Sequence, residues 1–122
     1  MTRCVLIVDD EEDICQIVQA SLEEFGEWQT LVATSAVEGL ELAQRQLPDL
    51  ILLDASMPGM DGFAMFERLQ GNPTTQGIPV ILLTSKVMAC DRKRFEAMSI
   101  VGVITKSFNP LTIWQRVGEL LV

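Results

Sequence analysis

The apolar residues of this chain form short uninterrupted runs, and longer stretches with helical spacing lie between them. Runs of four aliphatic residues are too short for an exposed amphipathic helix and are typical of strands that are buried on both faces. With two less continuous apolar stretches they predict five strands, at residues 3–8, 28–33, 50–53, 79–84 and 100–104. The second run is less apolar than the others, which favours a place nearer an edge of a sheet.

Helices are predicted between the strands. The first helix carries an apolar stripe made of Ile14, Ile17, Val18, Leu22 and Phe25. Ser35 and Glu38 have the spacing of a capping box and open the second helix. Asn109 and Pro110 fit the N-cap and the first position of the last helix. The third and fourth helices are predicted at residues 62–69 and 86–98.

Strands and helices that alternate in this way predict an α/β fold with right-handed βαβ units and a parallel sheet covered on both faces. The runs at 3–8, 50–53 and 79–84 are the most apolar and are therefore expected in the middle of the sheet. This arrangement matches the flavodoxin-like, doubly wound strand order 2-1-3-4-5 with five helices. The chain has no linker or internal repeat, and we predict one domain over residues 1–122, with no effector domain.

Polar side chains follow the predicted strands at their carboxyl ends. Asp9 and Asp10 follow the first strand, Asp54 follows the third, Thr84 ends the fourth, and Lys106 comes after the fifth. Parallel strands bring these ends to one edge of the sheet, at the switch point where open α/β sheets bind ligands. Asp54 taken alone fits a turn cap equally well. The convergence of several polar residues indicates a functional site instead.

The residue types at this edge indicate the chemistry. Carboxylates within a few ångströms of one another repel unless a cation compensates them. Mg²⁺ suits such a site, because it prefers oxygen ligands and is commonly held by carboxylates together with phosphate. The Lys106 ammonium and the Thr84 hydroxyl can bind an anion beside the metal. These features predict Mg²⁺-dependent phosphoryl transfer in which Asp54 is the nucleophile and becomes an aspartyl phosphate.

The composition excludes several classes of function. The chain has no histidine, which excludes a Ser-His-Asp triad, a His-bound zinc and a phosphohistidine within it. The formal net charge of −8 disfavours direct binding to nucleic acid, which needs a basic footprint. Three cysteines without a Cys-x-x-Cys pair predict reduced thiols and a cytoplasmic location. No signal peptide is recognised, and no apolar run approaches the roughly 20 residues of a membrane span.

The chain as a whole resembles the receiver (CheY-like) domain of two-component response regulators. The resemblance rests on motifs in the family's order and at plausible spacings, which are Asp9-Asp10, Asp54 with Met57-Pro58-Gly59-Met60-Asp61-Gly62 behind it, Thr84-Ser85, and Lys106. It implies that Asp54 accepts a phosphoryl group from a phosphohistidine of a sensor histidine kinase or a histidine phosphotransfer protein. Such a domain is a phosphoacceptor in signalling rather than a turnover enzyme, and it can catalyse its own phosphorylation and dephosphorylation.

The resemblance also implies roles for the residues around Asp54. Asp10 would bind Mg²⁺ directly, Asp9 would support the ion largely through water, and the backbone carbonyl of Ser56 would be a further ligand. Thr84 and Lys106 would bind the phosphoryl oxygens, and Thr84 would move towards them to report the modification. The face formed by the last helices and the fifth strand would contact partners, including a second receiver in a homodimer.

Several positions depart from the family's usual pattern. The family's lysine is commonly followed by proline in a cis peptide, whereas Lys106 is followed by Ser107, for which a cis bond costs about 3–4 kcal/mol. We expect a cis bond only if the site imposes it, and otherwise a trans bond with Lys106 held less firmly. Val103 stands at the position of the family's switch aromatic and has no ring to rotate. Lys86 and Ser56 lie where the family tunes the lifetime of the phosphoryl group.

Other polar residues have simpler interpretations. We interpret the acids at 11–13 as first-turn residues favoured by the helix dipole rather than as metal ligands. Asp61 is interpreted as a helix cap, and the methionines at 57, 60 and 65 as packing residues. The basic run at 92–94 is interpreted as a solvated helix face, with contact to a partner as the alternative.

Two other functions stay open at this point. A degenerate receiver, acting as an interaction module without phosphate, is suggested by Val103 and Ser107. A small Mg²⁺-dependent phosphohydrolase would use Asp9 as its nucleophile, with Glu11 as the next acid, although the chain of 122 residues has no cap or substrate domain. A flavin-binding relative of flavodoxin is disfavoured, because the acids at 9–13 would repel the phosphate of the cofactor.

Overall fold

The structure, a computed structural model, describes residues 3–85 and 89–121. Five parallel strands form one sheet in the order β2-β1-β3-β4-β5, which confirms the predicted α/β fold and its strand order. The strands are β1 (Cys4–Val8), β2 (Gln29–Ala33), β3 (Leu50–Asp54), β4 (Val80–Thr84) and β5 (Gly102–Thr105). The helices between and after them are α1 (Glu12–Phe25), α2 (Ala36–Gln46), α3 (Gly62–Gln70), α4 (Ala89–Glu96) and α5 (Ile113–Leu121).

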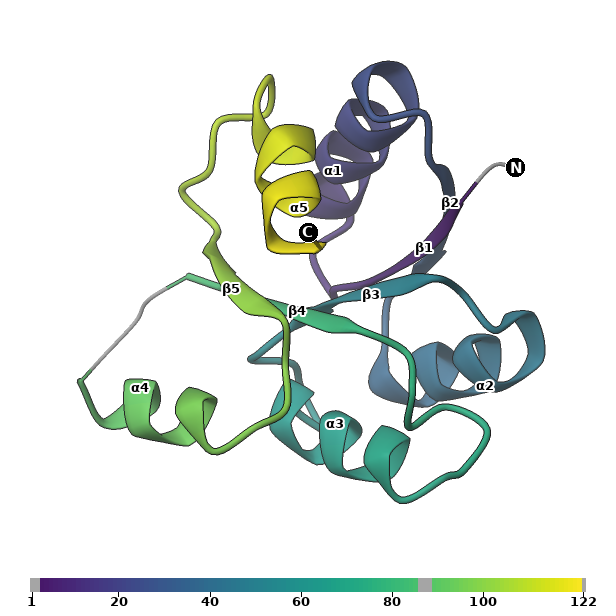
Figure 1. Ribbon diagram of the computed structural model, residues 1–122, viewed down its shortest axis with the longest axis vertical. Helices are drawn as coiled ribbons and strands as arrows, with labels where there is room; N and C mark the ends of the chain where they lie inside the picture. The colour runs from purple at the N-terminus through teal and green to yellow at the C-terminus, as the bar shows by residue number, and fades with distance from the viewer. Residues whose placement is uncertain (1–2, 86–88, 122) are drawn as a thin grey trace.

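Helices cover both faces of the sheet. Helices α1 and α5 lie on one face, and α2, α3 and α4 lie on the other (Figure 1). Side chains of the central strands alternate between the two layers, so that Leu6 and Leu53 pack towards α2 and α3, while Ile7 and Leu52 pack towards α1 and α5. All residues of β3 and β4 are buried, and each large aliphatic side chain among them contributes about 1.5–3 kcal/mol by leaving water.

The strand register brings the carboxyl ends of the strands level with one another. Val8 pairs with Leu53, and Thr84 pairs with Thr105. The residue that follows each of Val8, Leu53 and Thr105 is one of the predicted site residues. The continuous apolar runs therefore do more than form the core, because their ends place polar side chains together at one edge of the sheet.

The first helix differs in detail from the predicted stripe. Its buried apolar residues are Cys15, Val18 and Leu22, whereas Ile17 and Phe25 are exposed, so the prediction was wrong for these two. The buried residues are three and four positions apart, which is the spacing of a single helix face. Ile17 lies off this face because it is two positions from Cys15, which places it more than half a turn away around the helix. No helix in the described part of the chain is long and apolar enough to cross a membrane.

Two helix starts test the capping predictions. The Ser35 side chain accepts a hydrogen bond from the Glu38 backbone at 3.2 Å, which confirms the predicted N-cap of α2. The last helix begins at Ile113 rather than at Pro110, so that prediction was wrong. Asn109 does accept a bond from the Leu111 backbone at 2.9 Å, but its side chain closes a turn that precedes α5. Asn is favoured in both positions, and the sequence pattern does not separate them.

Candidate functional site

Asp54 ends β3 and is almost completely buried, with 2% of its surface exposed. Its Oδ1 atom accepts a hydrogen bond from the Ser56 backbone at 3.1 Å. Its Oδ2 atom is buried and accepts no hydrogen bond from the described residues, although it lies 3.2 Å from the Lys106 ammonium. One carboxylate oxygen is thus fixed by the turn behind the strand, and the other is directed at the charged groups of the site.

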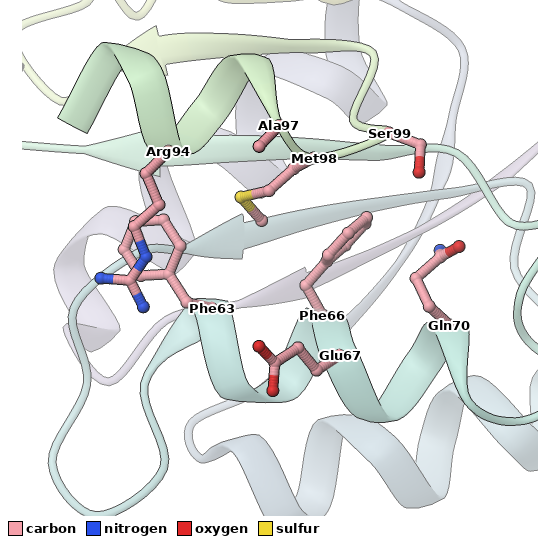
Figure 2. A pocket seen from close by; sticks show the side chains of 8 residues that line it. All are labelled: Phe63, Phe66, Glu67, Gln70, Arg94, Ala97, Met98 and Ser99. Carbon is pink, nitrogen blue, oxygen red and sulfur yellow. The ribbon is translucent and has the colours of Figure 1, made fainter.

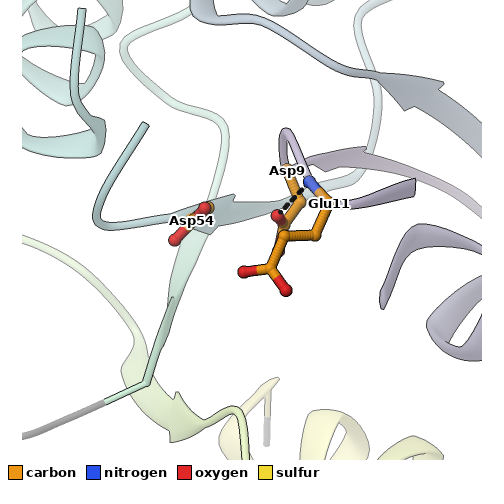
Figure 3. Close-up of side chains that lie close together, drawn as sticks. All are labelled: Asp9, Glu11 and Asp54. Carbon is orange, nitrogen blue, oxygen red and sulfur yellow. Dashed lines mark hydrogen bonds between the residues drawn. The ribbon is translucent and has the colours of Figure 1, made fainter. Parts of the chain in front are cut away.

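Three carboxyl groups meet at this edge of the sheet. Asp9, Glu11 and Asp54 each place one oxygen within 4.8 Å of the others (Figure 3). Asp9 is fully buried, like Asp54, whereas the Glu11 side chain is 56% exposed. The Glu11 backbone donates a hydrogen bond to Asp9 Oδ1 at 2.9 Å, which fixes the chain where it leaves β1.

Lys106 provides the positive charge that faces these groups. Its Nζ atom lies 2.8 Å from Glu11 Oε1, 3.1 Å from Asp9 Oδ2 and 3.2 Å from Asp54 Oδ2, and the side chain is 10% exposed. The Lys106 backbone donates a hydrogen bond of 2.7 Å to the Thr84 carbonyl, which ties the lysine to the end of β4. One ammonium therefore serves three carboxyl groups.

Burial and crowding change the proton affinities at the site. The pKa of Asp54 is raised to about 7, because burial and the charge of Asp9 together outweigh the opposing effects of the Ser56 amide and Lys106. Burial alone would lower the pKa of Lys106, but its hydrogen bonds to Glu11 and Asp9 and the charge of Asp54 outweigh burial and raise it. The lysine is thus held as an ammonium, and in the part of the chain that the structure describes it is a single positive charge facing three carboxyl groups.

The donor set fits a hard divalent cation. Asp9 Oδ2 and Asp54 Oδ2 are both buried carboxylate oxygens that accept no hydrogen bond, and oxygens of this kind are the ligands that Mg²⁺ prefers. Asp10 is exposed, and its carboxylate lies outside the group of three that the described residues form. Its direct contact with a metal stays a prediction, as does the use of the Ser56 carbonyl.

Glu11 belongs to the group of three carboxyl groups, although the sequence pattern was interpreted as placing it in the first turn of α1. It occupies the N-cap position of α1 with extended backbone angles, φ −90° and ψ 103°, and its side chain makes no capping bond. Residues two apart share one side of an extended chain, so the spacing of Glu11 from Asp9 was a usable signal. The interpretation of Glu11 as a first-turn helix acid overlooked this spacing and missed its contact with Lys106.

The loop after β5 takes one of the two forms expected for Lys106. No peptide bond in the described residues is cis, so the bond before Ser107 is trans. Lys106 reaches Asp54 at 3.2 Å with this bond, and the expectation that a trans bond holds it less firmly stays a prediction. The backbone bond to Thr84 and the three carboxyl groups fix the lysine without a cis peptide.

The remaining predicted positions lie around this centre. Thr84 is buried at the end of β4, and its movement on phosphorylation stays a prediction. Val103 is partly buried and packs against the core layer of α2 and α3, and it has no ring to rotate between buried and exposed positions. Ser56 is exposed beside Asp54. Lys86 lies outside the described residues.

The turn behind Asp54 depends on a glycine. A Cβ atom on Gly62 would lie 2.2 Å from the Asp54 carbonyl oxygen and 2.8 Å from the Ala55 Cα, and both are backbone atoms that cannot swing away. Asp61 caps α3 as predicted, accepting a hydrogen bond from the Ala64 backbone at 2.9 Å. Helix α3 therefore starts in direct contact with the backbone of Asp54.

We predict that Gly62→Ala lowers the free energy of unfolding by at least about 2 kcal/mol, because the new methyl group overlaps the Asp54 backbone. Urea denaturation measures the change. Gly77→Ala is the matched control, since a Cβ there meets no atom within 4 Å, and a change within about 0.5 kcal/mol is expected. Equal losses in the two variants would contradict the close approach of Gly62 to Asp54.

A surface pocket elsewhere on the molecule contains none of the predicted site residues. It has a volume of about 400 Å³ and lies between α3 and α4 (Figure 2). The Arg94 guanidinium stacks over the Phe63 ring at 3.5 Å, and Phe63 stacks on Phe95 with ring centroids 5.7 Å apart. At least one residue of the basic run at 92–94 is therefore packed against apolar surface rather than simply solvated.

Met57 and Met65 are buried in the core, which confirms their interpretation as packing residues.

Comparisons with known proteins agree with the fold. The chain is 37% identical over 121 residues to response regulator PleD of Caulobacter vibrioides, covering 98% of this chain and 26% of PleD. It is 33% identical over 117 residues to response regulator Rre1 of Synechocystis, covering 96% of this chain and 51% of Rre1. The chain thus spans about a quarter of the first relative and about half of the second.

A structural superposition and a match to a family model agree on the family. The solved structure of the chemotaxis protein CheY4 of Vibrio cholerae superposes with a TM-score of 0.90 at 27% identity, covering 98% of this chain and 99% of that chain. The family model for the response regulator receiver domain matches residues 5–118, which include Asp9, Asp54, Thr84 and Lys106. With this match over nearly its whole length, the chain belongs to the receiver domain family of response regulators.

Proposed function

We propose that Asp54 accepts a phosphoryl group from a phosphohistidine of a sensor histidine kinase or a histidine phosphotransfer protein, in a Mg²⁺-dependent reaction. The observation that carries this proposal is the Asp54 Oδ2 atom, which is buried, lies 3.2 Å from the Lys106 ammonium and accepts no hydrogen bond within residues 3–85 and 89–121. A carboxylate held in this way is a nucleophile with a cation already beside it. Receiver domains are signalling domains, and we propose the same role for residues 1–122 as one unit.

The proposed step is an in-line displacement at phosphorus. Asp54 Oδ2 forms the new P–O bond, the P–N bond of the phosphohistidine breaks, and its electron pair stays on the imidazole nitrogen. Lys106 binds a phosphoryl oxygen, and the Thr84 hydroxyl donates a hydrogen bond to another. Asp54 must be ionised to attack, and Lys106 favours this form, because its positive charge opposes the increase in the Asp54 pKa that burial causes.

The buried carboxylates are the proposed metal site. Asp9 and Asp54, with Asp10 and the Ser56 carbonyl, would hold Mg²⁺. When bound, the ion supplies positive charge that compensates the carboxylates and the transferring phosphoryl oxygens. The same centre without phosphate would be a degenerate interaction module, but the contacts among Asp9, Asp54 and Lys106 favour the phosphoacceptor.

Partner contacts follow from the place of the site in the fold. We propose that phosphorylation alters the ends of β4 and β5, and that partners or a second receiver dock on the face of α4, β5 and α5. Lys106 directly follows the end of β5, and α4 and α5 come after β4 and β5 along the chain (Figure 1). We further propose that the protein acts in the cytoplasm, where kinases supply the phosphoryl group.

The test is phosphorylation by a small acyl phosphate. In the presence of Mg²⁺, intact-protein mass spectrometry should show an adduct of one phosphoryl group, which is absent in Asp54→Asn and after chelation of the metal. Glu41→Gln, a distant and exposed change of the same type, should leave the adduct unchanged. No adduct despite Mg²⁺ binding would favour the degenerate module. Sustained hydrolysis of sugar phosphates would favour the phosphohydrolase.

A further inference from the structure

We infer that Glu11 is a positioning residue that holds the Lys106 side chain at the entrance of the site. By holding the lysine there, Glu11 lowers the rate at which Asp54 is phosphorylated. The inference rests on the proposed function, since it concerns how readily Lys106 is released to bind phosphoryl oxygens. It assigns to Glu11 a role other than that of a metal ligand or a helix cap.

The contact between Glu11 and Lys106 is the shortest that the ammonium makes. The distance of 2.8 Å from Nζ to Glu11 Oε1 compares with 3.1 Å to Asp9 and 3.2 Å to Asp54. Glu11 is also the single partner of the three that water reaches, because Asp9 and Asp54 are buried. Its carboxylate is therefore the solvent-exposed one of the three that contact the lysine. It lies close to the two buried acids (Figure 3).

The local backbone leaves the Glu11 side chain available for this contact. Glu11 stands at the N-cap position of α1, where a side chain commonly accepts a bond from the helix backbone, yet it makes none. Its own amide is occupied by Asp9 Oδ1 at 2.9 Å, which fixes the residue beside the site. The carboxylate reaches across to Lys106 instead.

The three partners of Lys106 differ in how easily they are replaced. The ammonium donates hydrogen bonds to Glu11 Oε1 at 2.8 Å and Asp9 Oδ1 at 3.3 Å and lies 3.2 Å from Asp54 Oδ2. A phosphoryl oxygen therefore binds Lys106 in competition with these carboxylates. The contacts with Asp9 and Asp54 are shielded from water and costly to break. The exposed contact with Glu11 is the easiest of the three to replace, because water can solvate the Glu11 carboxylate once Lys106 releases it. Glu11 also carries a negative charge at the entrance for an anionic phosphodonor.

The contact with Lys106 and the negative charge at the entrance should both slow phosphorylation, so Glu11→Gln should raise the rate of phosphorylation. The expected increase is about two- to five-fold, the range that the loss of one exposed ion pair permits. Glu12→Gln is the matched control, because Glu12 is the next residue, is exposed, and loses the same charge without a contact to Lys106 among the described residues.

The experiment compares three proteins, namely the unaltered chain, Glu11→Gln and Glu12→Gln. The readouts are the rate of adduct formation with acyl phosphate and Mg²⁺, the Mg²⁺ affinity by calorimetry, and the Lys106 ammonium signal by ¹⁵N NMR without phosphodonor. We expect a faster rate and a shifted ammonium signal in Glu11→Gln alone, with equal Mg²⁺ affinities in the two variants. A slower rate with weaker Mg²⁺ binding would make Glu11 a metal ligand and overturn the inference, as would an unchanged ammonium signal.

Failure of the proposed function has a different signature. It would appear as no adduct on the unaltered chain, and the proposed restraint on phosphorylation would fall with it. The ammonium signal would still show whether Glu11 holds Lys106, because it is recorded without any phosphodonor.

Discussion

Replacing Lys106 with methionine is expected to lower the free energy of unfolding by about 3–5 kcal/mol in the metal-free protein at pH 8. The lysine is the cation that faces Asp9, Glu11 and Asp54, and two of these carboxyl groups are buried. Methionine keeps the length and apolar stem of the side chain but leaves the buried negative charges unpaired. Urea denaturation in the presence of a chelator measures the loss.

Arg116→Met is the matched control for this variant. Arg116 lies 3.6 Å from Glu119, and both side chains are exposed, so removing this pair should change stability by no more than about 1 kcal/mol. The loss in Lys106→Met should shrink when Mg²⁺ is added, since a bound cation would compensate the same carboxylates. A loss of less than 1 kcal/mol in the metal-free protein would show that Lys106 is not the main compensating charge.

Asp54→Asn should have the opposite effect and stabilise the metal-free protein at pH 8. Burial and the charge of Asp9 raise the pKa of Asp54 from 3.8 to about 7, so the folded protein binds this proton more tightly than the unfolded chain. Stability therefore falls as the pH rises between about 4 and 7, and the full cost is present above pH 7. Asparagine removes the charge, and at 1.36 kcal/mol per pKa unit the gain reaches at most about 4 kcal/mol.

The pH dependence separates this effect from a general change in packing. The gain from Asp54→Asn should be largest at pH 8 and should vanish near pH 4, where the carboxyl group is protonated in the folded protein. Mg²⁺ should reduce the gain, because it stabilises the ionised form. Asp10→Asn is the control, and we expect a change of less than about 0.5 kcal/mol for this exposed residue without metal. A destabilised Asp54→Asn at pH 8 would contradict the account.

The fold and the centre of the site were predictable because they follow from the order of strands and helices along the whole chain. Solid apolar runs at β1, β3 and β4 indicate central parallel strands, and parallel strands bring their carboxyl ends together. That alone places Asp9, Asp54 and Lys106 at one edge, whatever the loops between them do. The resemblance to receivers added the roles of these residues but was not needed for their proximity.

The details that sequence reasoning missed depend on local backbone conformation. Glu11 faces Lys106 because the chain stays extended after β1, and the start of α1 could equally have turned it outward. The start of α5 depended on whether Asn109 caps a turn or a helix, and its side chain suits both. The bond before Ser107 depended on tertiary contacts of Lys106, which no local pattern encodes.

The position of the phosphoryl group tests the central claim most directly. After incubation with Mg²⁺ and acyl phosphate, rapid proteolysis and fragment mass spectrometry at low pH can assign the group to a single residue. We predict that it is found on Asp54, the buried carboxylate 3.2 Å from the Lys106 ammonium. A phosphoryl group on Asp9, or none on any residue of a protein that binds Mg²⁺, would contradict the account.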